Sequence, residues 1–271
     1  MGFDWSGLRD PAPGELVAAR EAAHWAVQWV AKAARANLPA APDDGHTALA
    51  WDAALGGFAC ALPEGITVSL SLSPLELVLT GDGETRRLAL EARRRPSAVD
   101  QWFDEALSAR GLQHASQVAL PYEAPERPAA DPPGLEALAS WYGAAAEVLE
   151  ELRSKYSALR PGPVRLWPHH FDLAVLVGLD EDGGESSRSI GVGVSPGDAA
   201  YAQPYAYVSP YPAPKDPQLP ALPPGGRWHT QDFFAAVATA DDLLAQEHPR
   251  AALLEVIDTA FEASRHWLDQ K

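Results

Sequence analysis

The sequence predicts an α+β fold in which antiparallel sheets pack against long helices. Apolar residues alternate strictly over residues 66–72, which is typical of a strand with one buried and one solvated face. The turn-forming residues 81–83 separate two further strand-like runs and predict a hairpin. Over residues 135–159, apolar side chains recur at spacings of three and four, which indicates a long helix packed along one partner.

A helix, an antiparallel meander and a second helix make up the predicted first half. Polar residues and alanines fall on opposite faces over residues 15–35, so the first helix is expected there. Ser97, with Asp100 three residues later, is typical of a helix start, and Gly111 is typical of a helix end. The expected strands are 47–55, 58–62, 66–72, 75–79 and 86–90, with a further strand at 117–120.

A boundary between two halves is predicted at residues 121–134, a segment that contains five prolines. We therefore expect domains at residues 1–125 and 126–271 that pack as one unit. Both halves read as helix, antiparallel strands, helix, so two similar halves derived by duplication are an alternative description.

The second half is expected to alternate strands with proline-rich connections and to end in helices. Residues 210–226 are too rich in proline for a strand and are expected to form an extended surface loop. Thr239 and Asp242 indicate the start of a short helix, and the last helix is expected over residues 249–268. The expected strands are 164–167, 171–179, 189–194 and 205–208.

The composition favours a folded body that avoids polyanions. Of the 271 residues, 46% are hydrophobic and 21% are charged, which is close to the average of globular domains. The 37 acidic and 21 basic residues give a formal net charge of -16, which repels phosphate backbones and anionic lipid headgroups. The basic run at residues 93–95 is interpreted as a solvated connector. We therefore expect neither a nucleic-acid partner nor a membrane partner.

The chain contains a single cysteine, Cys60, among apolar neighbours. One cysteine excludes an intrachain disulfide and a zinc site built on several thiolates, and we expect it to be buried as a small hydrophobic residue. No apolar run approaches the roughly 20 residues of a membrane-spanning helix, and residues 1–5 lack the order of a signal peptide. A cytoplasmic location is therefore expected, for a monomer or, if the long helix self-associates, a homodimer.

Several segments of the second half resemble an uncharacterised bacterial family, a domain of unknown function. The resembling residues are 151–156 at the end of the long helix, Pro163, Val164, Trp167, 171–174, 205–207, Tyr211 and Pro212, together with the closing helix. The first half resembles that family more faintly, in a helix, a sheet and residues 102–103. The resemblance implies the α+β architecture and brings no established activity. Where that family has small residues before Phe-Asp-Leu-Ala, this chain has Pro168, His169 and His170, so a role for these histidines would be particular to this chain.

Aromatic residues are concentrated around the proline-rich segment. Tyrosine and tryptophan combine a large apolar surface with one hydrogen-bonding tip, which suits the lining of a pocket or an interface. We expect binding of a small organic ligand or a partner segment under this loop, without a cofactor or a bound metal. Packing of the loop over the core is the structural alternative. The candidate ligand-binding residues are Tyr205, Tyr207, Tyr211, Trp228 and His229.

An enzyme with His170 and Asp172 as catalytic residues is the second hypothesis. Alternate residues of a strand point to the same face, so a strand through this segment brings the two side chains together. They offer a general base, or two ligands for a divalent metal, with Tyr207, His229 or His46 as helpers. The structural alternative is that Asp172 accepts hydrogen bonds where a strand begins while the histidines are exposed.

Motifs of several common enzyme classes are missing from the sequence. There is no Gly-x-Gly-x-x-Gly segment between a strand and a helix, no phosphate-binding Gly-Lys-Ser/Thr and no Gly-x-Ser-x-Gly. Dinucleotide-dependent enzymes, P-loop ATPases and typical serine hydrolases are therefore not expected.

Overall fold

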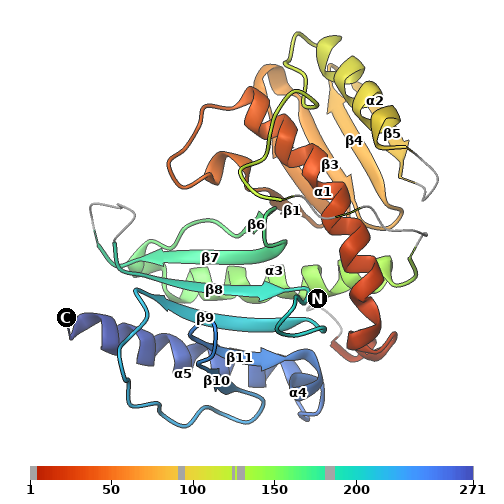
Figure 1. The fold of residues 1–271 in the computed structure, drawn as a ribbon. Helices are drawn as coiled ribbons and strands as arrows, with labels where there is room; N and C mark the ends of the chain where they lie inside the picture. Colours follow the sequence, from red (N-terminus) through yellow and green to blue (C-terminus); the bar gives the residue numbers. More distant parts are fainter. Residues whose placement is uncertain (1–4, 91–94, 124–125, 127–131, 181–186, 271) are drawn as a thin grey trace. The chain divides into compact units, whose positions relative to one another are not determined.

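The computed structural model describes residues 5–90, 95–123, 126, 132–180 and 187–270. It confirms the predicted α+β class, because 40% of the chain is helical and the strands form two antiparallel sheets against which long helices pack (Figure 1). The chain divides into two compact units. Unit 1 comprises residues 1–15, 141–164 and 172–271, and unit 2 comprises residues 16–140 and 165–171. The domain boundary between residues 125 and 126 stays a prediction.

Unit 2 contains a five-stranded antiparallel meander in the order β1-β2-β3-β4-β5. The helices α1 (Val17–Asn37) and α2 (Pro96–Ser108) lie on one face of this sheet (Figure 1). The strand β6 (Arg165–Trp167) also belongs to unit 2, where Leu166 pairs with Leu49. The strands of the meander are β1 (Ala50–Asp52), β2 (Gly57–Ala61), β3 (Thr67–Ser71), β4 (Glu76–Gly81) and β5 (Glu84–Ala89).

The core of unit 2 covers both faces of β3, so the predicted solvated face is wrong: Ser69 and Ser71 are buried like the apolar residues between them. Val68 and Leu70 on β3 point to the same face of the sheet and are fully buried. The indole Nε1 of Trp29 on α1 donates a hydrogen bond of 2.9 Å to Asp100 Oδ1 and so links α1 to α2. Cys60 on β2 is buried as expected, and this burial raises the pKa of its thiol to about 11. A thiol with this pKa is a weak nucleophile at neutral pH.

Unit 1 contains an antiparallel sheet whose strands lie in the order β10-β11-β9-β8-β7. The helix α5 (Pro249–Asp269) and the part of α3 (Leu135–Lys155) from residue 141 onwards lie on one face of this sheet (Figure 1). The short helix α4 (Ala240–Leu244) follows the last strand directly and begins with the predicted cap, because Thr239 accepts a hydrogen bond from the Asp242 N–H. The strands are β7 (Asp172–Gly178), β8 (Ser189–Ser195), β9 (Tyr205–Tyr211), β10 (Arg227–His229) and β11 (Ala235–Thr239).

The two faces of the unit 1 sheet carry different side chains. Residues directly opposite on neighbouring antiparallel strands share a face, so each row across the sheet belongs to one side. On the side that α5 covers, which we call the helix-covered face, one row is Val175, Val192, Val208 and Ala236, all buried. On the other side, which we call the tyrosine face, the next row is Ala174, Gly193, Tyr207 and Val237.

Four strand assignments differ from the sequence prediction. The strand β9 continues through Pro210, which is tolerated because β11 pairs with β9 only as far as Val208 and leaves that side of the strand end as an edge. The strand predicted at 117–120 is wrong, because this segment is a turn followed by unpaired chain. The strands β10 and β11 were not predicted; β11 is mostly alanine and shows no alternation.

Short 3₁₀ helices complete the described part of the chain. They are η1 (Trp5–Arg9), η2 (Pro13–Leu16), η3 (Gly45–Thr47), η4 (Pro63–Gly65) and η5 (Ser157–Leu159). Among the helices within the described residues, none is both long and apolar enough to cross a membrane.

Candidate functional site

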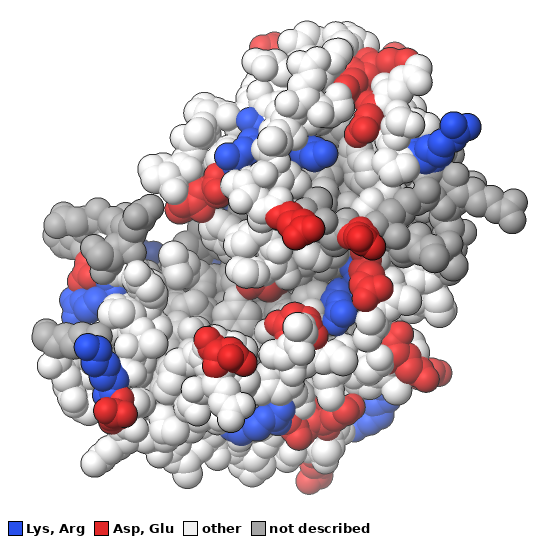
Figure 2. Space-filling view, viewed as in Figure 1, with Lys and Arg blue, Asp and Glu red and all other residues white. Residues whose placement is uncertain are grey.

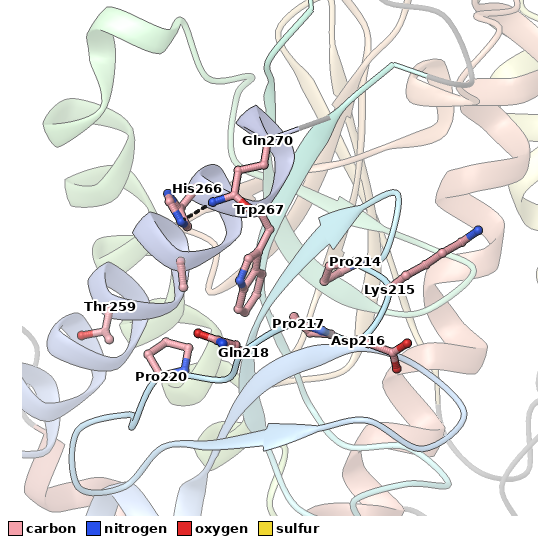
Figure 3. Close-up of a pocket in the computed structure, with 11 residues that line it drawn as sticks. Pro214, Lys215, Asp216, Pro217, Gln218, Pro220, Thr259, His266, Trp267 and Gln270 are labelled. Carbon is pink, nitrogen blue, oxygen red and sulfur yellow. Dashed lines mark hydrogen bonds between the residues drawn. The ribbon is translucent and has the colours of Figure 1, made fainter.

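A cleft of about 880 Å³ opens in unit 1 between the proline-rich loop after β9 and the last three turns of α5 (Figure 3). Residues 214–220 of the loop form one wall, and residues 259–270 of α5 form the other. The volume falls within the range of roughly 300–1,000 Å³ that is typical of sites for small molecules. Both apolar rings and polar side chains line the cleft, which is the mixture that such sites require.

The α5 wall is built by one stripe of the helix. Its residues are Thr259, Ala263, His266, Trp267 and Gln270. Their spacings of four, three, one and three place them on one side of α5, next to the stripe that packs on the sheet. The ring of Trp267 points from the helix toward the loop, and Gln270 Nε2 lies 2.5 Å from His266 Nε2 (Figure 3). This wall therefore offers one indole ring and two linked polar groups.

The loop wall is held in place by Trp228, one of the predicted ligand-binding residues. The indole Nε1 of Trp228 donates a hydrogen bond of 2.8 Å to the carbonyl oxygen of Pro220. The Trp228 ring also packs against Trp267, with 5.1 Å between ring centroids, and stacks on Phe234 at 5.7 Å. Trp228 thus contacts a residue of each wall and links the two.

Two polar groups of the cleft lack partners within the described part of the chain. Neither the amide of Gln218 nor the indole N–H of Trp267 makes a hydrogen bond to another described residue. Lys215 and Asp216, adjacent in the loop, also line the cleft. Over the face drawn in Figure 2, acidic and basic side chains are interspersed, with no broad basic area among the residues shown. Because Lys215 and Asp216 carry opposite charges, they give the cleft no strong charge of either sign.

The tyrosine face is organised differently, around a buried carboxylate. The side chain of Tyr207 crosses from β9 over Gly193 of β8 and donates a hydrogen bond to Asp172 Oδ2 on β7. A Cβ atom on Gly193 would lie 2.5 Å from the Tyr207 hydroxyl oxygen, so only glycine leaves room for this crossing. Asp172 is 8% exposed. Burial, and then the charge of Asp172, raise the pKa of Tyr207 well above its ordinary value.

A second tyrosine–carboxylate pair lies at the end of the same strand. The Tyr205 hydroxyl donates to Asp198 Oδ2 at 2.5 Å, and burial raises the pKa of this tyrosine. Asp198 itself is exposed, and its Oδ1 accepts hydrogen bonds from the backbone N–H groups of Ala200 and Tyr201. Tyr205 thus fastens the turn before β9 to the sheet.

His229 and Tyr201 form the third pair of the tyrosine face. The Tyr201 hydroxyl lies 2.8 Å from His229 Nδ1, and the guanidinium of Arg227 lies 5.2 Å from the centre of the Tyr201 ring. His229 stacks on Phe233, with 4.0 Å between ring centroids. His229 Nε2 is buried and has no hydrogen-bond partner among the described residues. The hydroxyl groups of Tyr201, Tyr205 and Tyr207 each contact a histidine or a carboxylate of the same region.

His170 does not lie on a strand. Residues 168–171 form a turn, in which the N–H of Phe171 donates to the carbonyl oxygen of Trp167 at 2.7 Å, and Phe171 has a φ of 58°. The strand β7 begins only at Asp172. The strand alternation that paired His170 with Asp172 therefore does not apply, and His170 is exposed, with its ring 4.2 Å from that of His169.

Two side chains of α1 hold this turn within unit 2. His24 Nε2 and Gln28 Nε2 lie 2.9 and 3.0 Å from the carbonyl oxygen of Pro168. The Gln28 side-chain oxygen accepts a hydrogen bond of 2.7 Å from the Tyr122 hydroxyl, and the His24 ring stacks on Phe171. Burial lowers the pKa of His24. These contacts explain structurally why the segment before Asp172 forms a turn.

The described residues offer no support for the metal site of the second hypothesis. Within the described residues, no three side chains of the His, Cys, Asp or Glu type are grouped closely enough to hold a metal ion. His46, the other suggested helper, accepts a hydrogen bond of 3.2 Å from the Ala41 N–H through Nδ1.

The predicted ligand-binding residues therefore separate. Trp228 supports the cleft, whereas Tyr205, Tyr207 and His229 lie on the tyrosine face and do not line it. Tyr211 ends β9 with 52% of its surface exposed. The sequence reasoning missed Trp267 and Gln218. Trp267 could have been found, because it directly precedes Leu268 and so lies at the border of the predicted inner face of the last helix. Nothing in the loop sequence distinguished Gln218.

Comparisons with models of protein families, with curated proteins and with solved structures find no match to this chain. The resemblance to an uncharacterised bacterial family stays a prediction, and the site rests on its own geometry.

Proposed function

We propose that this protein is a binding protein that takes an organic ligand in the cleft between the proline-rich loop and α5. The observation that carries this proposal is the cleft itself, which combines a ligand-sized volume with an indole ring and unpaired polar groups. Three of the six loop residues that line the cleft are prolines, which lose little conformational freedom when a ligand binds because proline restricts the backbone. Trp228 adds rigidity by linking the two walls.

The tyrosine face gives less support for a ligand site. Its hydroxyl groups are engaged with Asp172, Asp198 and His229, so a ligand would first have to break these hydrogen bonds. The general-base hypothesis loses the strand alternation on which it was based, because His170 lies in a turn and not on the strand.

The proposal is tested by recording the indole N–H signals of the nine tryptophans by NMR while compact ring fragments are added. Suitable probes are indole, phenol, nicotinamide and glucose. The signal of Trp267 is identified by its loss in Trp267→Phe. We expect at least one fragment to shift this signal saturably, with a dissociation constant of about 1 mM or below, as is usual for weak small ligands.

Trp102 serves as the internal control, because it lies in unit 2, where it packs against Phe103 and Arg86. Its signal should not move. If fragments shift other indole signals and leave that of Trp267 unchanged, the ligand site lies elsewhere and the proposal is wrong.

A further inference from the structure

The turn at residues 168–171 contains a strained residue. Phe171 has a φ of 58°, in the left-handed region that a bulky side chain rarely adopts. Its side chain is 1% exposed and packs against the rings of His24 and Phe58, with 5.1 and 5.9 Å between ring centroids. A strained conformation persists only where the surrounding contacts hold it. The closed turn therefore depends on these two rings and on the hydrogen bonds that Pro168 accepts.

His24 binds the turn in one defined tautomer. The carbonyl oxygen of Pro168 only accepts hydrogen bonds, so His24 Nε2, 2.9 Å away, carries a hydrogen and donates it. Burial and the nearby charges of Arg20 and His170 lower the pKa of His24, although the hydrogen bond to Pro168 opposes them. The packed ring is therefore neutral near pH 7, and protonation of its Nδ1 favours release of the ring into water.

Two further imidazole rings lie on the turn itself. The ring centroids of His169 and His170 are 4.2 Å apart, so a charge on one ring disfavours a charge on the other. Burial, and then the charge of His170, lower the pKa of His169 to about 4. In an open turn each imidazole is solvated and separate, with the ordinary pKa of about 6.5. Between these two pH values, the closed turn therefore binds fewer protons than an open one.

The other ionisable groups around the turn do not offset this repulsion. Among the described residues, no carboxylate forms an ion pair with any of the three histidines. Asp44 favours the charged form of His169, but it pairs with Arg35 at 2.9 Å. Tyr122, whose ring centroid lies 5.8 Å from that of His169, has a pKa raised to about 12 by burial and stays neutral in acid.

We propose that the turn at residues 168–171 is an acid-sensitive switch, closed while its three histidines are neutral and opened when they are protonated. The chain passes from unit 2 to unit 1 between Phe171 and Asp172, so opening releases the connection between β6 and β7. Asp172 itself accepts a hydrogen bond from Tyr207. The switch does not depend on the proposed function, because none of its residues lines the cleft.

The size of the response follows from the difference in proton binding. Because the pKa of His169 is lower in the closed turn, closure is fully favoured above about pH 6.5 and is lost as the pH falls toward about 4. Between pH 7 and pH 5, a change of this one pKa from 6.5 to about 4 multiplies the equilibrium constant for opening by roughly 20. The lowered pKa of His24 acts in the same direction.

Hydrogen exchange followed by NMR measures this opening. The reporter is the N–H of Phe171, which donates to the Trp167 carbonyl oxygen at 2.7 Å, and the reference is the N–H of Val68 on the central strand of the unit 2 sheet. Between pH 7 and pH 5, we expect the protection factor of Phe171 to fall at least tenfold. At pH 5 it should also lie at least tenfold below that of Val68, whose exchange requires the sheet to unfold.

Two results of this experiment would overturn the inference. An unchanged protection factor of Phe171 would mean that the turn does not respond to acid. Equal protection of Phe171 and Val68 at pH 5 would mean that the turn opens only when the whole unit unfolds.

Matched histidine variants assign the response. His169→Gln removes the imidazole that sets the expected response, so the fall in Phe171 protection should become at least fivefold smaller. His170→Gln removes the neighbouring charge and should reduce the fall to a lesser extent. His114→Gln replaces a histidine of the same unit outside the turn and should keep the wild-type fall. The Phe171 protection at pH 7 checks that each variant closes the turn, and an undiminished fall in both His169→Gln and His170→Gln contradicts the inference.

Discussion

The two faces of the unit 1 sheet show how differently aromatic and polar residues can be used. On the tyrosine face, each tyrosine hydroxyl of the three pairs is bound to a carboxylate or to His229. Beside the helix-covered face, Trp267 and Gln218 line an open cleft, and neither the indole N–H nor the amide makes a hydrogen bond to another described residue. Density of aromatic residues therefore does not by itself locate a ligand site. Polar side chains that are hydrogen-bonded to each other indicate a structural role. Unpaired polar side chains that line a cleft indicate a ligand site.

The largest loss of stability is expected at Gly193, where the crossing Tyr207 side chain leaves no room for a Cβ atom. Gly193→Ala places a Cβ atom 2.5 Å from the Tyr207 hydroxyl oxygen and should lower the free energy of unfolding by about 2–3 kcal/mol through overpacking. Gly191→Ala is the matched control on the same strand and face, since its Cβ would lie 3.8 Å from the nearest atom, the Ser209 carbonyl oxygen. Denaturant unfolding measures both. A Gly193→Ala protein as stable as Gly191→Ala would mean that Tyr207 does not cross the sheet as described.

A smaller effect is expected from removing the hydroxyl groups. Tyr207→Phe deprives the buried Asp172 of a donor and should cost about 2 kcal/mol of unfolding free energy. Tyr205→Phe affects the exposed Asp198, which water can solvate, and should cost about 1 kcal/mol or less. Denaturant unfolding at pH 8 compares the two. Equal losses would show that burial does not distinguish the two pairs.

Alkaline pH sharpens the same comparison. Because the pKa of Tyr207 is raised in the folded protein, its contribution is fully present below the ordinary tyrosine pKa of about 10 and is lost as the pH rises above it. The stability difference between the wild type and Tyr207→Phe should therefore shrink by about 1 kcal/mol between pH 10 and pH 11. Urea unfolding at these two pH values measures it. An unchanged difference would indicate that Tyr207 ionises equally easily in both states.

The sequence predicted the elements better than it predicted the site. Alternation at residues 66–72 and the spacing over 135–159 correspond to β3 and α3, because the period of the apolar residues distinguishes a strand from a helix, although β3 is buried on both faces. The alanines of β11 show no such pattern. The sequence around Pro210 also does not reveal that one side of β9 is an unpaired edge there, which is why the strand can continue through a proline. These features depend on which strands become neighbours.

The site depended on tertiary contacts to a greater degree. The sequence placed Trp228 next to His229, but β10 turns the first toward Trp267 and the second toward Tyr201. Likewise, the His170–Asp172 pairing assumed a strand, whereas the contacts of His24 and Gln28 with Pro168 hold a turn. The sequence identifies which side chains have the chemistry to bind a ligand. The tertiary structure decides which of them are already paired with other side chains.

The most direct test compares one variant from each region with the same probe. Indole affinity is measured through the Trp267 signal in Ala263→Leu, which narrows the cleft, and in Tyr207→Phe, which loosens the tyrosine face, at a temperature where both remain folded. A cleft site predicts at least a tenfold loss in Ala263→Leu and a change of less than twofold in Tyr207→Phe. The reverse pattern, with binding lost in Tyr207→Phe and kept in Ala263→Leu, would move the ligand site to the tyrosine face.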